Sequence, residues 1–213
     1  IPRDNPFVKN QNTNALGEIY ALGFKNPHRI TWSKSGQMLV CHIGHKRIES
    51  VNLVMPGHDY GWPAREGIFA LDPYGDLNKV YPLPADDSIY NITYPIAQYE
   101  HDESWAAISG GYEYLGAAIP QLRGKFIFGD IPTGRLFYID MADARQGKLA
   151  PIKEWNVSVN SIKKTLLDLC GSDRADLHFG RDIHGELYIL TKTDGKVYRL
   201  ASATSAGAGC MDK

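Results

Sequence analysis

Residues 124–139 read GKFIFGDIPTGRLFYI, and residues 185–200 read GELYILTKTDGKVYRL. In each stretch a glycine precedes a short run of aromatic and aliphatic residues, and a second glycine ten positions after the first opens another such run. Short apolar runs separated by a turn that contains glycine predict a β-hairpin. The chain therefore uses one β-hairpin unit twice.

A third, looser copy lies at residues 36–54, where Gly36 precedes the apolar run 38–41 and a turn leads to the run 51–54. Repeated hairpins are typical of a β-propeller, in which four-stranded blades stack around an axis because no blade buries both faces alone. Three unrelated hairpins in a β-sandwich are the alternative. The equal glycine spacing in the two best copies favours the propeller.

The composition is that of a globular protein. Of the 213 residues, 43% are hydrophobic and 22% are charged, so the chain can bury a core. The formal net charge of −1 argues against nucleic acid or an anionic membrane as the main partner, since both require a clustered positive surface. The sequence holds no apolar run of about 18 residues, so we expect no membrane-spanning helix.

The length suggests an incomplete ring of blades. A blade takes about 40–45 residues, so this chain supplies roughly four, or fewer if the segment 64–108 forms none. The chain begins at Ile1 without an initiator methionine, and we expect it to be excised from a longer protein. We predict a partial propeller at residues 1–200 with an insertion at about 64–108, and a flexible tail at 201–213. Another chain or segment is expected to complete the propeller.

Outside the hairpins the sequence predicts a few more elements. One helix is expected at 158–169, with Ser161 as a possible cap and Ile162, Leu166 and Leu169 on one face. Further strands are expected at residues 18–22, 30–32, 94–99 and 110–115.

Several short motifs occur in a distinctive order: IPRDNPF at 1–7, EIYALGFKNP at 18–27, YGWP at 60–63, GGY at 110–112 and GKFIFGD at 124–130. Together they resemble the glucose/sorbosone dehydrogenase family. The resemblance implies an all-β, six-bladed propeller that is periplasmic or extracellular and oxidises small-molecule sugars with pyrroloquinoline quinone (PQQ) beside a calcium ion. This chain would supply roughly the C-terminal half to two thirds of such a propeller.

The resemblance also implies cofactor-binding residues. Lys25 and Asn26 match the family's Arg-Asn pair before proline, where a cation would stabilise negative charge on the reduced quinone and the amide would orient an oxygen. Lysine keeps the charge but loses the two-pronged geometry of arginine. On the alternative reading, Lys25 lies at a solvated rim and Asn26 fixes the turn before Pro27. No catalytic residue is assigned, because the family's histidine base would lie upstream of Ile1; the fragment alone is therefore expected to be inactive.

For calcium, Gly44 and His45 match the positions whose backbone carbonyls hold the ion beside the quinone. Glu49 and the carbonyl of Tyr60 are candidate ligands for a second, structural calcium ion. This second site would be weakened by Ser50, which stands where family members commonly have a second acidic residue. A transition-metal site at His42, His45 and Glu49 is the alternative, but two histidines three residues apart on a strand face opposite sides.

Some family positions are not matched. The turn 131–134 lacks the family's lysine, and Ala175 and Leu177 stand where paired arginines are expected. Arg174, His178 and Arg181 are near but in another register, and a one-residue offset turns a strand side chain to the other face. A non-catalytic propeller that binds a protein or a glycan through its rim loops is therefore the main alternative. A lactone-hydrolysing propeller would need several carboxylates and amides around a central metal, and the sequence offers no such set.

Overall fold

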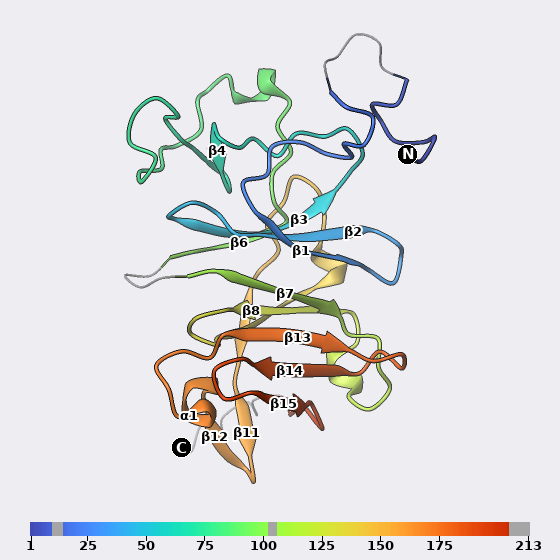
Figure 1. Ribbon diagram of the computed structural model, residues 1–213, viewed down its shortest axis with the longest axis vertical. Coiled ribbons are helices and arrows are strands. Elements are labelled where there is room, and N and C mark those ends of the chain that lie inside the picture. The colour runs from blue at the N-terminus through green and yellow to red at the C-terminus, as the bar shows by residue number, and fades with distance from the viewer. Residues whose placement is uncertain (10–14, 102–105, 205–213) are drawn as a thin grey trace, which may run out of the picture.

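The computed structural model describes residues 1–9, 15–101 and 106–204 and consists mostly of β-strands, as predicted. Three antiparallel sheets lie one on another (Figure 1). The first sheet, in spatial order, contains β1 (Pro27–Trp32), β2 (Met38–His42), β3 (Ile48–Val54) and β6 (Ala97–Glu100). The second contains β7 (Ile108–Glu113), β8 (Lys125–Asp130), β9 (Leu136–Asp140) and β10 (Lys153–Trp155). The third contains β13 (Leu177–Arg181), β14 (Leu187–Thr191) and β15 (Lys196–Arg199).

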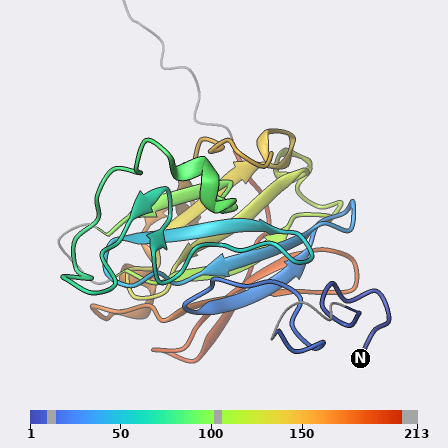
Figure 2. The same cartoon turned by 90° about the horizontal axis from the view of Figure 1, so that it is seen from above.

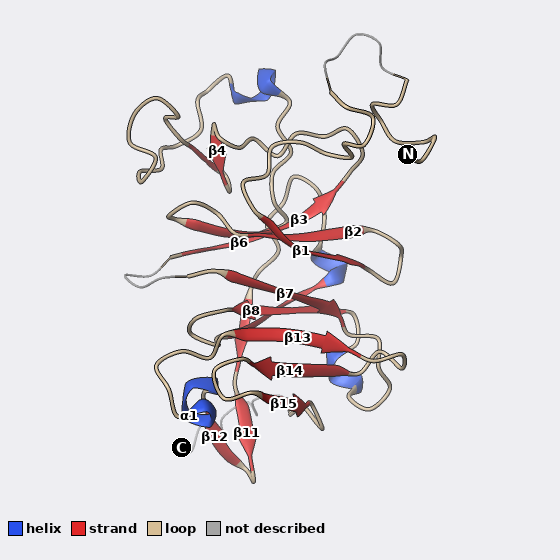
Figure 3. Cartoon of the chain, viewed as in Figure 1, coloured by secondary structure: helices blue, strands red, loops and turns tan. Residues whose placement is uncertain are grey.

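The smaller elements lie outside these sheets, and Figure 3 shows how little of the chain is helical. Two further ladders pair β4 (Arg65–Glu66) with β5 (Phe69–Ala70), and β11 (Val157–Val159) with β12 (Ile162–Lys164). The helical turns are η1 (Asp87–Tyr90), η2 (Pro120–Leu122), η3 (Met141–Asp143) and α1 (Leu166–Cys170). Within the described ranges no helix is long and apolar enough to cross a membrane.

All three predicted hairpins are confirmed. Residues 124–139 form β8 and β9, residues 185–200 form β14 and β15, and residues 36–54 form β2 and β3. Alternation of side chains along each strand lets one sheet supply two interfaces. Phe126 and Phe128 of β8 pack toward the first sheet, whereas Ile127 between them packs toward the third. The second sheet is therefore buried on both faces.

The sheets contact one another through their first strands, since β7 lies beside both β1 and β13. This is the arrangement expected of neighbouring propeller blades. The N-terminal segment and the long excursion after β3 lie over the far face of the first sheet, as Figures 1 and 2 show. Residues 97–100, inside the range 64–108 assigned to an insertion, form β6 and complete the first sheet. Of the tail predicted at 201–213, residues 205–213 lie outside the described residues.

The helix predicted at 158–169 is wrong. Residues Asn160 and Ser161 have φ of 51° and 65°, which makes a tight hairpin turn between β11 and β12. The helix α1 begins only after Thr165, whose side chain accepts a hydrogen bond from the Asp168 backbone N–H in a capping box. The apolar spacing resembled a helix, but β-branched residues and the turn decided the first half of the segment.

The strand predicted at 18–22 is also absent from the ladders. Its backbone bonds instead to the turn after β3: the N–H of Gly57 donates to the carbonyl of Tyr20, and the N–H of Leu22 donates to the carbonyl of His58. Only an isolated bridge between Leu22 and Asp59 remains. The segment therefore fastens the turn after β3.

Candidate functional site

The loops at one end of the first sheet bring together residues that lie far apart in the sequence. The Lys25 ammonium, just before β1, donates a hydrogen bond of 2.8 Å to the carbonyl oxygen of Gly44, in the loop between β2 and β3. The neighbouring carbonyl of Asn26 accepts from the N–H of Ile43 at 3.0 Å. Lys25 and Asn26 are exposed. Lys25 and Asn26, the residues assigned to a cofactor, thus lie beside Gly44, which is assigned to a metal.

His42, at the end of β2, fixes the backbone of Lys25. Its Nε2 accepts a hydrogen bond of 3.1 Å from the Lys25 N–H, and the ring of Phe24 packs edge-on against it at 5.3 Å. Burial, together with the positive charge of Lys25, lowers the pKa of His42 to about 4, although the charge of Glu66 acts in the opposite direction. His42 is therefore neutral at physiological pH and acts as an acceptor.

His45 belongs to a different environment from His42. Its ring lies 5.7 Å from the ring of Trp62. In the part of the chain that the structure describes, no group of three or more metal-binding side chains comes together. The alternative of a transition-metal site at His42, His45 and Glu49 is therefore wrong. His42 accepts a hydrogen bond from the Lys25 backbone, and His45 packs on the ring of Trp62.

Glu66, which no sequence motif indicated, organises the loop between β2 and β3. Its side chain is only 2% exposed, and its Oε1 accepts hydrogen bonds from four consecutive backbone N–H groups. The donors are His45 at 2.6 Å, Lys46 at 3.0 Å, Arg47 at 3.0 Å and Ile48 at 3.1 Å. In the sequence Glu66 is only an acidic residue before Gly67. Nothing local indicates that it binds backbone N–H groups about twenty residues earlier in the chain.

This arrangement sets the direction of the loop carbonyls. In a trans peptide the N–H of one residue and the carbonyl of the preceding residue point to opposite sides. Because the N–H groups of residues 45–48 point at Glu66, the carbonyls of residues 44–47 face away from it. Gly44 is required here, since a Cβ would lie 1.9 Å from the carbonyl oxygen of Ile48. Of these carbonyls, that of Gly44 accepts from the Lys25 ammonium, whereas that of Arg47 accepts from the His101 N–H at 2.8 Å.

Glu49 has a structural role in this geometry. It is fully buried, its Oε1 lies 2.7 Å from His101 Nε2 and accepts from the Gly44 N–H at 3.3 Å, and its Oε2 accepts from the Ile108 N–H at 2.7 Å. Burial raises the pKa of Glu49, while the bonds to His101 and to the two N–H groups lower it. Three partners thus hold the Glu49 carboxylate in the core, and its use by a calcium ion stays a prediction.

Tyr60 fastens the turn after β3. Its hydroxyl donates to the Leu53 carbonyl at 2.6 Å and accepts from the Met55 N–H at 2.9 Å, and its ring stacks on Phe24 at 4.4 Å. Burial raises the pKa of Tyr60 to about 12. The use of its carbonyl by a second calcium stays a prediction.

The positions matching the family's paired arginines lie in the core. Ala175 and Leu177 are fully buried between the second and third sheets. The nearby basic residues are engaged elsewhere: Arg174 pairs with Asp176 at 2.7 Å, and Arg181 lies over the ring of Tyr112 at 4.9 Å. The described residues at these positions therefore do not form the expected clamp for an anionic cofactor.

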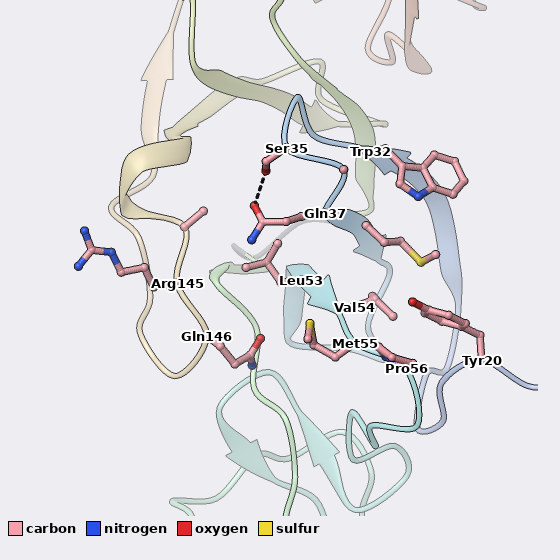
Figure 4. Close-up of a pocket in the computed structure, with 13 residues that line it drawn as sticks. Tyr20, Trp32, Ser35, Gln37, Leu53, Val54, Met55, Pro56, Arg145 and Gln146 are labelled. Atoms are coloured by element: carbon pink, nitrogen blue, oxygen red, sulfur yellow. Dashed lines mark hydrogen bonds between the residues drawn. The ribbon is translucent and has the colours of Figure 1, made fainter. Parts of the chain in front are cut away.

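A pocket lies at the other end of the first sheet (Figure 4). It has a volume of about 510 Å³, and its lining includes Tyr20, Trp32, Gln37, Met55, Arg145 and Gln146. Its lining contains no acidic side chain and none of the predicted site residues. We place the candidate site at the loops, because charged groups and directed carbonyls meet there.

The loops fit a hard cation better than they fit the whole cofactor. Backbone carbonyls are suitable calcium ligands, and Gly44 already directs one toward a positive charge. Lys25 and Asn26 lie beside it, whereas the basic clamp is replaced by buried Ala175 and Leu177.

The chain is similar to proteins of one family over nearly its whole length. The family described as Glucose / Sorbosone dehydrogenase matches residues 1–199. The HIPL2 protein of Arabidopsis thaliana is 26% identical over 223 aligned residues, which cover 99% of this chain and 31% of the plant protein. Quinoprotein glucose dehydrogenase B of Acinetobacter calcoaceticus is 30% identical over 92 residues, which cover 43% of this chain and 18% of that protein.

Among solved structures, the apo form of the soluble aldose sugar dehydrogenase of Escherichia coli superposes with a TM-score of 0.64 at 21% identity, over 93% of this chain and 50% of that chain. The chain thus spans about a third of the plant relative and about half of the bacterial structure. The family match covers nearly the whole sequence. The chain belongs to the glucose/sorbosone dehydrogenase family.

Proposed function

We propose that this chain is the C-terminal part of a PQQ-dependent sugar dehydrogenase that transfers a hydride from an aldose- or sorbosone-type sugar to the quinone. The observation that carries the proposal is the contact between Lys25 and the Gly44 carbonyl, because it joins a cofactor-binding position to a metal-binding position across 19 residues. The similarity to a quinoprotein glucose dehydrogenase supports the same reaction class. We further propose that the protein is periplasmic or extracellular and that another segment completes a six-bladed ring.

The residues of this chain would then have distinct roles. A bound quinone supplies the hydride acceptor. The outward carbonyls of Gly44 and His45 would hold a calcium ion, since the N–H groups of the same loop are held by Glu66 on the other side. The Lys25 ammonium would stabilise negative charge, and the Asn26 side chain would orient an oxygen at the exposed rim.

The test uses the full-length protein, incubated with calcium and PQQ and then assayed for dye reduction with a panel of aldoses. We expect sugar-dependent reduction that falls at least about tenfold in a Lys25→Ala variant, because one preorganised charge-stabilising group is lost. Lys34→Ala, at an exposed lysine in the turn between β1 and β2, is the matched control. The 213-residue piece alone should be silent. Silence of the full-length protein with every aldose would count against the enzyme.

A non-catalytic propeller of the same family, which binds a protein or a glycan, is the second candidate. The apolar side chains of Ala175 and Leu177 favour it, because these positions offer no positive charge to an anionic cofactor. Equilibrium dialysis of PQQ against the full-length protein separates the two candidates. Retention of PQQ with calcium supports the dehydrogenase, and no retention together with no turnover supports the binding protein.

A further inference from the structure

The Lys25 ammonium lies against the loop between β2 and β3. It donates to the Gly44 carbonyl at 2.8 Å, and no carboxylate pairs with it in the described ranges. The backbone of Lys25 is fixed as well, because its N–H donates a hydrogen bond of 3.1 Å to His42 Nε2. The ammonium therefore donates to a backbone carbonyl oxygen and forms no ion pair with an acidic side chain in the described ranges.

We propose that Lys25 is a tethered cation that competes with a metal ion for the Gly44 carbonyl and thereby lowers the calcium affinity of this loop. The inference rests on the proposed function, which places calcium at Gly44 and His45. A calcium ion would sit at about 2.3–2.6 Å from a carbonyl oxygen, and the same oxygen already accepts from the ammonium. Both cations cannot approach it without repelling each other.

The size of the effect follows from the charges. An ammonium and a calcium ion on one oxygen would lie about 4 Å apart, where the repulsion in water corresponds to about a thirtyfold change in affinity. Lys25 is exposed and its side chain is long, so it can swing aside and relieve part of the repulsion. Glu66, behind the loop, keeps a negative charge near the site in every variant of Lys25. We therefore expect about a tenfold tightening of calcium binding when the charge is removed.

The experiment titrates calcium chloride into the full-length protein without quinone, by calorimetry. Lys25→Gln removes the charge at similar length and should bind calcium about tenfold more tightly than the natural protein. Lys25→Arg keeps the charge and should not tighten binding. Lys34→Gln, which removes a positive charge at the other end of the first sheet, is the matched control and should change affinity less than about twofold.

A terbium titration locates the ion. The Trp62 ring lies 5.7 Å from that of His45, so a lanthanide at the loop should show emission sensitised by this indole, and Trp62→Phe should remove that emission. Equal affinity in the natural protein and Lys25→Gln overturns the inference, as does equal tightening by Lys34→Gln. Absence of calcium binding in all variants overturns it too. The proposed function is judged separately by dye reduction, so an active enzyme with unchanged calcium affinity would refute the inference alone.

Discussion

Replacing Glu66 by glutamine tests whether one buried carboxylate orders the loop that carries Gly44 and His45. In the structure a single oxygen of Glu66 accepts four backbone N–H groups, at 2.6 to 3.1 Å. Glutamine has nearly the same shape and can still place a carbonyl oxygen at this position. It removes the charge, and it puts an amide group where the other carboxylate oxygen is buried without a hydrogen-bond partner among the described residues.

The magnitude follows from the kind of hydrogen bond that changes. A hydrogen bond to a charged group contributes about 1.5–3 kcal/mol and a neutral one about 0.5–1.5 kcal/mol, so each donor loses about 1 kcal/mol. The four donors share one oxygen and three of them are only partly buried, so the sum is an upper bound. We expect the free energy of unfolding to fall by about 2–4 kcal/mol.

Urea unfolding of the natural protein and Glu66→Gln measures this difference from the midpoints, provided that the slopes agree. Glu154→Gln is the matched control, because this glutamate forms a surface ion pair with Arg135 in which the side chains are 45% and 41% exposed. Such a pair contributes about 0–1 kcal/mol. If Glu66→Gln is no more destabilised than Glu154→Gln, the carboxylate does not order the loop.

Three further predictions concern stability. Folding lowers the pKa of His42 from 6.5 to about 4, so its contribution to stability is fully present above pH 6.5 and is lost as the pH drops toward 4. Between about pH 7 and pH 5 the free energy of unfolding should therefore fall by about 2 kcal/mol more in the natural protein than in His42→Gln. Parallel pH profiles of the two proteins would contradict this. Gly111→Ala would place a Cβ 1.8 Å from the Ile127 carbonyl oxygen and should destabilise by about 3 kcal/mol or more in a thermal melt, whereas Gly180→Ala, with its nearest neighbour at 3.5 Å, should stay within about 1 kcal/mol. Thr165→Ala removes the cap of α1 and should lower the unfolding free energy by about 1 kcal/mol; an unchanged midpoint would show that the cap is dispensable.

The hairpins could be predicted because their signals are local. In 124–139 and 185–200, glycines ten positions apart bracket apolar runs of strand length, and such runs pair with their neighbour in the chain. The same reasoning failed at 158–169, where the spacing of Ile162, Leu166 and Leu169 imitates a helix. The left-handed backbone of Asn160 and Ser161 makes a hairpin there, and neither residue type requires that conformation.

The sequence by itself determined the β-hairpin units and the family, because both are carried by short motifs whose meaning does not depend on distant residues. Only the tertiary structure decided that Lys25 reaches the Gly44 carbonyl, that Glu66 binds the loop before β3, and that Ala175 and Leu177 are core residues. These contacts join loops and sheets far apart in the chain. They depend on which strand ends the packing places together and on which face each side chain takes, and a register that differs by one residue reverses that face.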